Sequence, residues 1–177
     1  MSIVTVNTKD YLKEDDLTRV VRYVVRADAE EDVFWDGLGV GTDSAENVIF
    51  DMFAVKQMFD KTEGKQLWHP VISIYRYQFI NRKEDYMHKM NNEEIYCKLI
   101  AMEICKLIFE MGYQNIFALH KDTDYLHLHF VVNSINYQTG NHLTNAYTFQ
   151  GELNRYLYDN YRNLQWEFYP HHHTENV

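Results

Sequence analysis

Hydrophobic positions along the chain recur with two different periods, and these periods predict the positions of helices and strands. Between residues 16 and 27 they lie three or four apart, which is the spacing of one helix face. Between residues 126 and 132 they alternate with other residues, which is the spacing of a strand. The predicted strands are 2–7, 67–77, 115–120, 126–136 and 165–168, and the predicted helices are 16–27, 44–64, 91–112 and 145–163. The glycine-rich stretch 36–42 is predicted to be a turn-rich connection.

These elements predict an α+β fold with a mainly antiparallel sheet. Strands 115–120 and 126–136 are joined by a short turn-forming stretch, so they should form an antiparallel hairpin at the centre of the sheet. We expect the helices to pack on one face of the sheet and to leave the other face open. The 177 residues suffice for one sizeable core, so residues 1–170 are predicted to form one domain, followed by a tail at 171–177.

The formal net charge of −9 argues against indiscriminate binding to nucleic acid, because such affinity comes mainly from Lys and Arg side chains that neutralise phosphates. Binding would need local basic patches. One candidate patch is formed by Arg19, Arg22 and Arg26 on the first predicted helix, and the other is the stretch 76–89. Taken alone, either patch is more often a solvated surface than a binding site.

The sequence also allows a prediction of the cellular compartment in which the protein acts. No apolar run approaches the roughly 20 residues of a membrane-spanning helix, and the N-terminus lacks the layout of a signal peptide. We therefore expect a cytoplasmic protein without a membrane partner, acting as a monomer. Cys97 and Cys105 would lie roughly 12 Å apart on one helix, too far for a disulfide, so we expect reduced thiols.

Three histidines of the predicted hairpin form the most informative pattern of the chain. His127 and His129 project from the same face of their strand, roughly 6.6 Å apart along it. His120 ends the preceding strand, so antiparallel pairing brings it across from that pair. Three imidazoles can bind one divalent metal and leave positions open for water or a phosphate oxygen. Asp122 can orient one of the histidines from outside the ligand set.

A less specific interpretation of these histidines stays open. With nine histidines in the chain, a His-x-His pair arises easily by chance, and a lone histidine is more often a surface or core residue. The position of His120 and the apolar opposite face of the strand favour the metal site.

A nucleophile is suggested by Tyr23, which lies among the three arginines of the first helix. Arg19 and Arg26 are at helical spacing on its own face. About one phenol in a thousand is ionised at neutral pH, so cationic neighbours or a metal would have to activate it. Since the chain has 14 tyrosines, most must be packing residues, and spacing alone favours that role for Tyr23 too.

Three stretches, in order, resemble motifs of the relaxase or mobilization nuclease family of plasmids and conjugative elements, part of the HUH endonuclease superfamily. RYVVRAD (22–28) resembles the tyrosine motif. FDKTEGKQLWHPVISI (59–74) resembles the second motif, with Ser73 at its serine position. HKDTDYLHLHFVVNSINYQTG (120–140) resembles the histidine motif, although Tyr125 stands where many members have another histidine.

The resemblance implies a site- and strand-specific DNA nicking and joining enzyme that initiates transfer of a plasmid or conjugative element. Tyr23 would attack single-stranded DNA at an origin of transfer and form a 5′-phosphotyrosyl adduct. The three hairpin histidines would hold Mg²⁺ or Mn²⁺, with Zn²⁺ as an alternative. Ser73 would contact the DNA backbone near the site, and accessory proteins of a relaxosome would be partners. Apart from the resemblance, we predict a substrate groove on the histidine face, lined by Ser73, Arg76 and the first helix. His69 would approach the site only if its strand twists.

Other functions remain open on the sequence. A rolling-circle replication initiator would use the same tyrosine chemistry at a different sequence. A non-catalytic DNA-binding or relaxosome accessory protein would keep the fold without nicking. A zinc-structured domain unrelated to DNA would bind the ion tightly and have no affinity for single strands.

Overall fold

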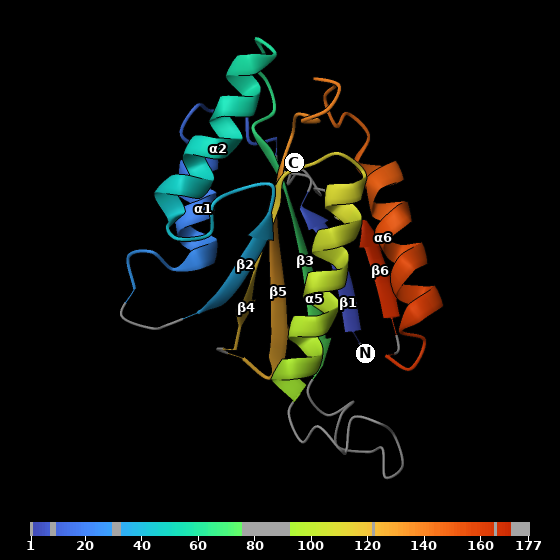
Figure 1. The fold of residues 1–177 in the computed structure, drawn as a ribbon. Helices are drawn as coiled ribbons and strands as arrows, with labels where there is room; N and C mark the ends of the chain where they lie inside the picture. The colour runs from blue at the N-terminus through green and yellow to red at the C-terminus, as the bar shows by residue number, and fades with distance from the viewer. Residues whose placement is uncertain are drawn as a thin grey trace, which may run out of the picture.

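The structure is a computed structural model, and it describes residues 2–7, 10–29, 33–75, 93–121, 123–164 and 166–170. The tail at 171–177 lies outside these residues. The elements follow one another in a mixed α and β order (Figure 1). They are β1 (Ser2–Asn7), α1 (Asp16–Val25), β2 (Phe34–Leu38), α2 (Ala45–Met58), β3 (Leu67–Tyr75), α5 (Glu93–Glu110), β4 (Asn115–His120), β5 (Tyr125–Asn133), α6 (Ala146–Asn160) and β6 (Trp166–Pro170).

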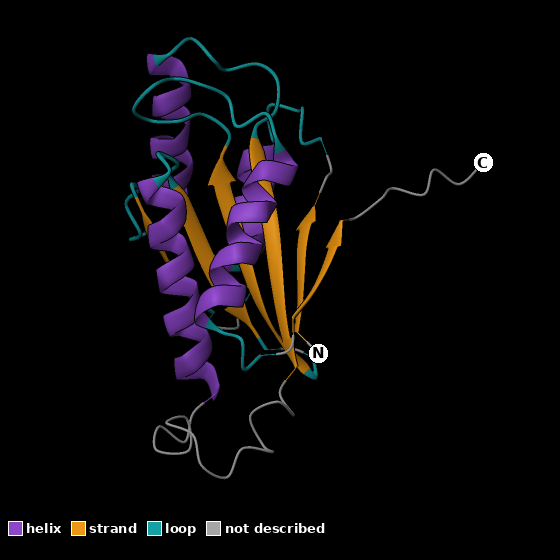
Figure 2. Ribbon diagram, turned by 90° about the vertical axis from the view of Figure 1, so that its right-hand side faces the viewer, coloured by secondary structure: helices purple, strands orange, loops and turns teal. Residues whose placement is uncertain are grey.

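The strands form one twisted six-stranded sheet in the order β2-β4-β5-β3-β1-β6, drawn in orange in Figure 2. Neighbouring strands from β2 to β1 are antiparallel, and β6 joins the edge parallel to β1. The predicted α+β class and the central hairpin of β4 and β5 are therefore confirmed. None of the helices in the described part of the chain is long and apolar enough to span a membrane.

Helices pack on both faces of the sheet, so the expectation of helices on one face is wrong. In Figure 1, α1 and α2 lie together at the left and α5 and α6 at the right. Phe130 and Leu128 of β5 pack in the core beneath α5 and α6. Val131 of the same strand packs with Ile116 of β4 in a second core beneath α1 and α2. Because β4 is buried at all six positions, both of its faces need cover.

Strand β2 includes residues 36–38 of the glycine-rich stretch 36–42, which was predicted to be a turn-rich connection, so that part of the prediction is wrong. It pairs with β4 from Phe34↔Leu119 to Leu38↔Asn115 and forms one edge of the sheet. A Cβ atom on Gly37 would lie 2.7 Å from the Asn115 carbonyl oxygen, so glycine here permits a close approach to β4. Backbone pairing with β4 therefore outweighs the weak strand propensity of glycine.

Helix α2 begins as predicted and ends earlier. The Ser44 hydroxyl accepts a hydrogen bond from the Asn47 backbone N–H at 3.1 Å, which caps the first turn. The helix ends at Met58 rather than near Gly64, because Asp60 adopts a left-handed backbone with φ of 54°. The Lys61 N–H then bonds back to the Lys56 carbonyl at 2.8 Å, which closes the helix end.

The larger core predicts a stability test at Phe130, which is fully buried and packs against Phe117 with ring centroids 6.1 Å apart. Phe130→Ala should lower the free energy of unfolding by about 3–5 kcal/mol, through lost burial and the cavity left behind. Phe50→Ala, at a side chain 72% exposed on α2, should change it by less than about 0.5 kcal/mol. Urea denaturation measures both, and equal losses would contradict this core.

Candidate functional site

Four histidines and a serine lie on the face of the sheet that α1 and α2 partly cover. The register pairs His120 of β4 with His127 of β5, and His127 with Ser73 of β3. Paired residues share a face, and so do residues two apart on a strand, which adds His129 and His69. The alternation of three neighbouring strands therefore brings these side chains together.

His129 lies at the centre of this histidine cluster, which consists of His69, His120, His127 and His129. Its ring centroid is 4.3 Å from that of His120, 5.3 Å from that of His69 and 6.2 Å from that of His127. From the sequence, we expected His69 to approach the site only if its strand twists. In the structure, its Nε2 lies 3.1 Å from His129 Nδ1. The sequence signal for this contact was the alternation face that His69 shares with Ser73.

Tyr23 borders the histidine cluster from helix α1. Its ring meets those of His120 and His129 edge-on, with centroids 6.0 Å away in both cases. The inner face of α1, with Val21 and Val24, is fully buried, whereas the Tyr23 side chain is 59% exposed. The phenol therefore faces both the imidazoles and solvent.

Burial keeps two of the imidazoles neutral. Desolvation lowers the pKa of His69 to about 4, and the nearby His120 ring adds to the shift. Desolvation also lowers the pKa of His129 to about 2, with further contributions from the other three imidazoles and Arg26. Both rings are thus uncharged near pH 7, and each has one nitrogen lone pair able to accept a proton or bind a metal.

Hydrogen bonds fix the orientation of the other two rings. His120 Nε2 donates to the Val24 carbonyl oxygen at 2.7 Å, so Nδ1 is the lone-pair nitrogen of the neutral ring. His127 contacts a hydroxyl at each nitrogen, with Ser73 Oγ 2.9 Å from Nδ1 and Thr123 Oγ1 2.9 Å from Nε2. His120 therefore links β4 to α1, and His127 is held between two hydroxyls.

The donor set fits a divalent ion in its chemistry, although the side chains need a small rearrangement. Imidazole nitrogens are common ligands of transition metals. As the side chains stand, no three His, Cys, Asp or Glu residues within the described ranges are arranged to hold a metal ion. His120 and His129 are adjacent, and His127 would have to release one of its hydroxyl contacts to join them.

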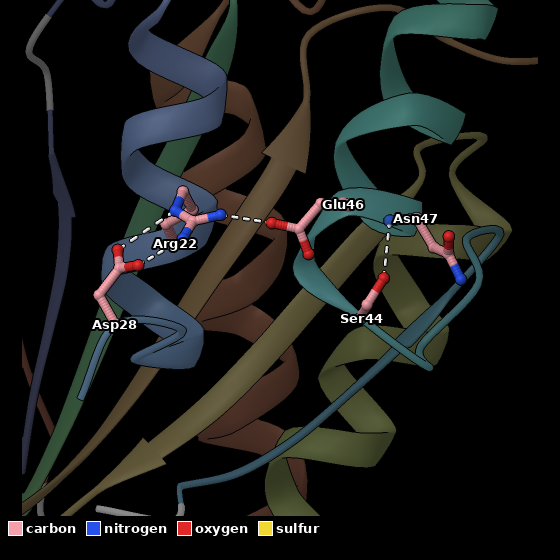
Figure 3. Close-up of polar contacts among 5 residues, drawn as sticks. All are labelled: Arg22, Asp28, Ser44, Glu46 and Asn47. Atoms are coloured by element: carbon pink, nitrogen blue, oxygen red, sulfur yellow. Dashed lines mark hydrogen bonds and ion pairs between the residues drawn. The ribbon is translucent and has the colours of Figure 1, made fainter. Parts of the chain in front are cut away.

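The three arginines of the first helix have different surroundings. Arg19 forms an ion pair with Asp16. Arg22 is bound by Asp28 and by Glu46 of α2, as Figure 3 shows, so two carboxylates already compensate its charge. Arg26 follows the helix in a left-handed conformation, and its charge acts on His129. Of the three, Arg26 has the clearest electrostatic link to the histidine cluster.

Of the remaining predicted site residues, the structure describes Ser73 and does not describe Asp122 or Arg76. Ser73 borders the histidine cluster, and its hydroxyl contacts His127. Asp122 and Arg76 lie outside the described residues, as does the whole basic stretch 76–89. The positions of these residues relative to the histidines remain predictions.

Comparison with known proteins identifies the family of this chain. A protein-family model described as relaxase, MobA/VirD2-like nuclease domain, matches residues 23–159. No curated protein and no solved structure matches the chain. The matched region covers most of the sequence and contains Tyr23 and all members of the histidine cluster. The chain therefore belongs to the relaxase, or mobilization nuclease, family of DNA endonucleases.

Proposed function

We propose that the protein is a site- and strand-specific relaxase that nicks and rejoins single-stranded DNA at an origin of transfer. Tyr23 is the nucleophile, and the cleaved strand stays attached to it through a 5′-phosphotyrosyl bond. The observation that supports this proposal is the 6.0 Å separation between the Tyr23 ring and those of both His120 and His129. The exposure of Tyr23 allows a DNA phosphate to reach its phenol.

Two other tyrosines lie near the cluster and are less suited to attack. Tyr11 is 5% exposed, and burial raises the pKa of its phenol, which reduces its nucleophilicity near neutral pH. Tyr75 packs against Tyr125 with ring centroids 4.9 Å apart, at the His127 end of the sheet. Such a pair of partly buried rings suits the stacking of an unpaired base better than attack on a phosphate.

The reaction exchanges one phosphodiester for another. The Tyr23 phenolic oxygen loses its proton and forms a bond to the scissile phosphorus, while the bond from phosphorus to the 3′ oxygen breaks. That oxygen leaves as a free 3′-hydroxyl after it takes up a proton. The tyrosine ester retains the energy of the original bond, so a 3′-hydroxyl can attack it later and reseal the strand.

His120, His127 and His129 would hold a divalent ion against the scissile phosphate. When bound, such an ion polarises the phosphate and stabilises the charge that develops on the leaving oxygen. We favour Mn²⁺ over Mg²⁺, because Mg²⁺ prefers oxygen ligands whereas imidazole suits transition metals. The neutral state of His129 leaves a lone pair for this role.

Two further contacts support the alignment of nucleophile and phosphate. The bond from His120 to the Val24 carbonyl fixes α1 against β4, which keeps Tyr23 next to the imidazoles. The positive charge of Arg26 acts on His129, and it can help to attract the phosphate. Chemistry of this type depends on such positioning, since small displacements of reacting groups cost large factors in rate.

Replacement of Tyr23 by phenylalanine tests the nucleophile. Tyr23→Phe should reduce formation of the covalent protein–DNA adduct by at least about 1000-fold, because phenylalanine lacks the oxygen atom that attacks the phosphate. The measurement is a denaturing gel after incubation with Mn²⁺ and single-stranded oligonucleotides from the transfer origin. Tyr158→Phe, at an exposed position on α6, is the matched control and should leave the adduct unchanged.

If the adduct persists in Tyr23→Phe, the nucleophile is Tyr75 or Tyr11 rather than Tyr23. If the unaltered protein binds origin DNA without any adduct, the role is that of a non-catalytic accessory protein. That alternative is favoured by the net charge of −9 and by the compensated Arg22. Cleavage at a replication origin instead would indicate a rolling-circle initiator.

Replacement of His129 tests the metal site. His129→Ala should weaken Mn²⁺ binding by more than about 100-fold, since the loss of a direct ligand exceeds the effect of an outer contact. Isothermal titration calorimetry measures the affinity, and adduct formation should fall in parallel. His142→Ala, outside the cluster, is the control. Equal Mn²⁺ affinities for His129→Ala and the unaltered protein would exclude His129 as a metal ligand.

A further inference from the structure

Tyr11 has an unusual backbone for a buried aromatic residue. Its φ of 45° lies in the left-handed region, which bulky side chains rarely adopt. The side chain is almost fully buried, and its phenolic oxygen lies 3.3 Å from Nδ1 of His69. Strain of this kind persists only where the surroundings enforce it, and it is frequent near functional sites.

The contact continues from Tyr11 through His69 to the centre of the histidine cluster. His69 is buried, and its other nitrogen, Nε2, lies 3.1 Å from Nδ1 of His129. Tyr11, His69 and His129 thus form a continuous chain of hydrogen-bonding groups. The contact to His69 is made by Nδ1 of His129. Nε2 of His129 lies on the other side of that ring and takes no part in this contact.

A buried lysine anchors the far end of this chain. The Gln66 backbone N–H donates to the Tyr11 carbonyl at 2.8 Å, which holds the strained residue in place. Lys56 of α2, with 0% of its surface exposed, donates to the Gln66 carbonyl and to Ser134 Oγ, both at 2.8 Å. These bonds connect α2 and the start of β3 to Tyr11, so the phenol is rigidly supported.

We propose that Tyr11 and His69 are positioning residues that fix the tautomer and orientation of His129, an inference that rests on the proposed metal-binding role of His129. A ring that binds an ion through Nε2 must carry its proton on Nδ1. That Nδ1–H then donates to His69 Nε2, and the His69 Nδ1–H donates to the Tyr11 hydroxyl oxygen. Each of these ring nitrogens has one role, and both ring protons have an acceptor.

The opposite order of protons along this chain of groups would prevent metal binding at His129. If Tyr11 donated to His69 Nδ1, His69 Nε2 would carry a proton and donate to His129 Nδ1. The His129 proton would then lie on Nε2, where it would block the metal-binding lone pair. Metal binding at His129 therefore selects one proton order along the whole chain. Ordinary metal sites use a carboxylate or carbonyl for this purpose, and here a second imidazole supplies the acceptor.

Two measurements test the proposal together. Nitrogen-15 NMR of the histidine rings in the metal-free protein should find His129 and His69 both protonated at Nδ1. Calorimetry should then give Mn²⁺ binding weakened about 10- to 100-fold in His69→Leu, which offers no acceptor. His69→Gln should bind within about 3-fold of the unaltered protein, because its side-chain oxygen can accept the same bond.

Tyr11→Phe provides a second variant that preserves packing and removes one oxygen atom. It should weaken Mn²⁺ binding roughly 3- to 10-fold, the effect of one lost hydrogen bond, and raise the fraction of His129 protonated at Nε2. Tyr158→Phe is the matched control, with both readouts unchanged. A purely structural role for Tyr11 would change thermal stability without a change of tautomer.

The outcomes separate this proposal from the proposed function. Protonation of His129 at Nε2 in the unaltered protein would overturn the positioning role. So would Mn²⁺ affinities of His69→Leu and Tyr11→Phe equal to that of the unaltered protein, and in that case the metal-dependent function would stand. No Mn²⁺ binding by the unaltered protein would overturn the proposed function, and the positioning role would fall with it.

Discussion

The antiparallel register between β4 and β5 is the constraint on which the rest of the site depends. It sets His120 opposite His127 and leaves the small side chain of Ala118 opposite His129. A shift of one residue would turn the β5 histidines into the core beneath α5 and α6 and expose leucines in their place. The burial of Leu126 and Leu128 therefore fixes the direction of the imidazoles as firmly as any contact they make themselves.

The face of the sheet that carries the imidazoles changes from buried to partly exposed along strand β5. Val131 lies in the core under α1 and α2, whereas His127, further along the strand, is partly exposed. His129 lies between these environments, close to both the buried His120 and the exposed Tyr23. Electrostatic interactions strengthen where water is excluded, and substrate needs access, so the boundary between covered and open sheet suits a reacting phosphate.

The local pattern of the chain predicted most of the framework, and long-range contacts account for the rest. Alternation predicted the histidine face, because it needs only the two-residue period of a strand. Strand β2 was not predicted, since its pairing with β4 involves a stretch whose glycines indicate a turn. The contact between Tyr11 and His69 joins residues 58 positions apart, through a left-handed backbone that no periodicity indicates. The compensation of Arg22 by Glu46 likewise required the packing of α1 on α2.

The acidic balance of the chain is compatible with a nuclease if geometry rather than overall charge selects the substrate. A net charge of −9 repels phosphates at long range, and ion pairs within the protein already engage Arg19 and Arg22. Affinity must then arise within about one Debye length of the site, roughly 8 Å at physiological salt. Arg26, whose charge acts on His129, is the candidate for such a local contribution. A domain of this kind gains little from non-specific binding along DNA, so the proposed nicking activity requires recognition by local contacts near Tyr23 and the histidine cluster.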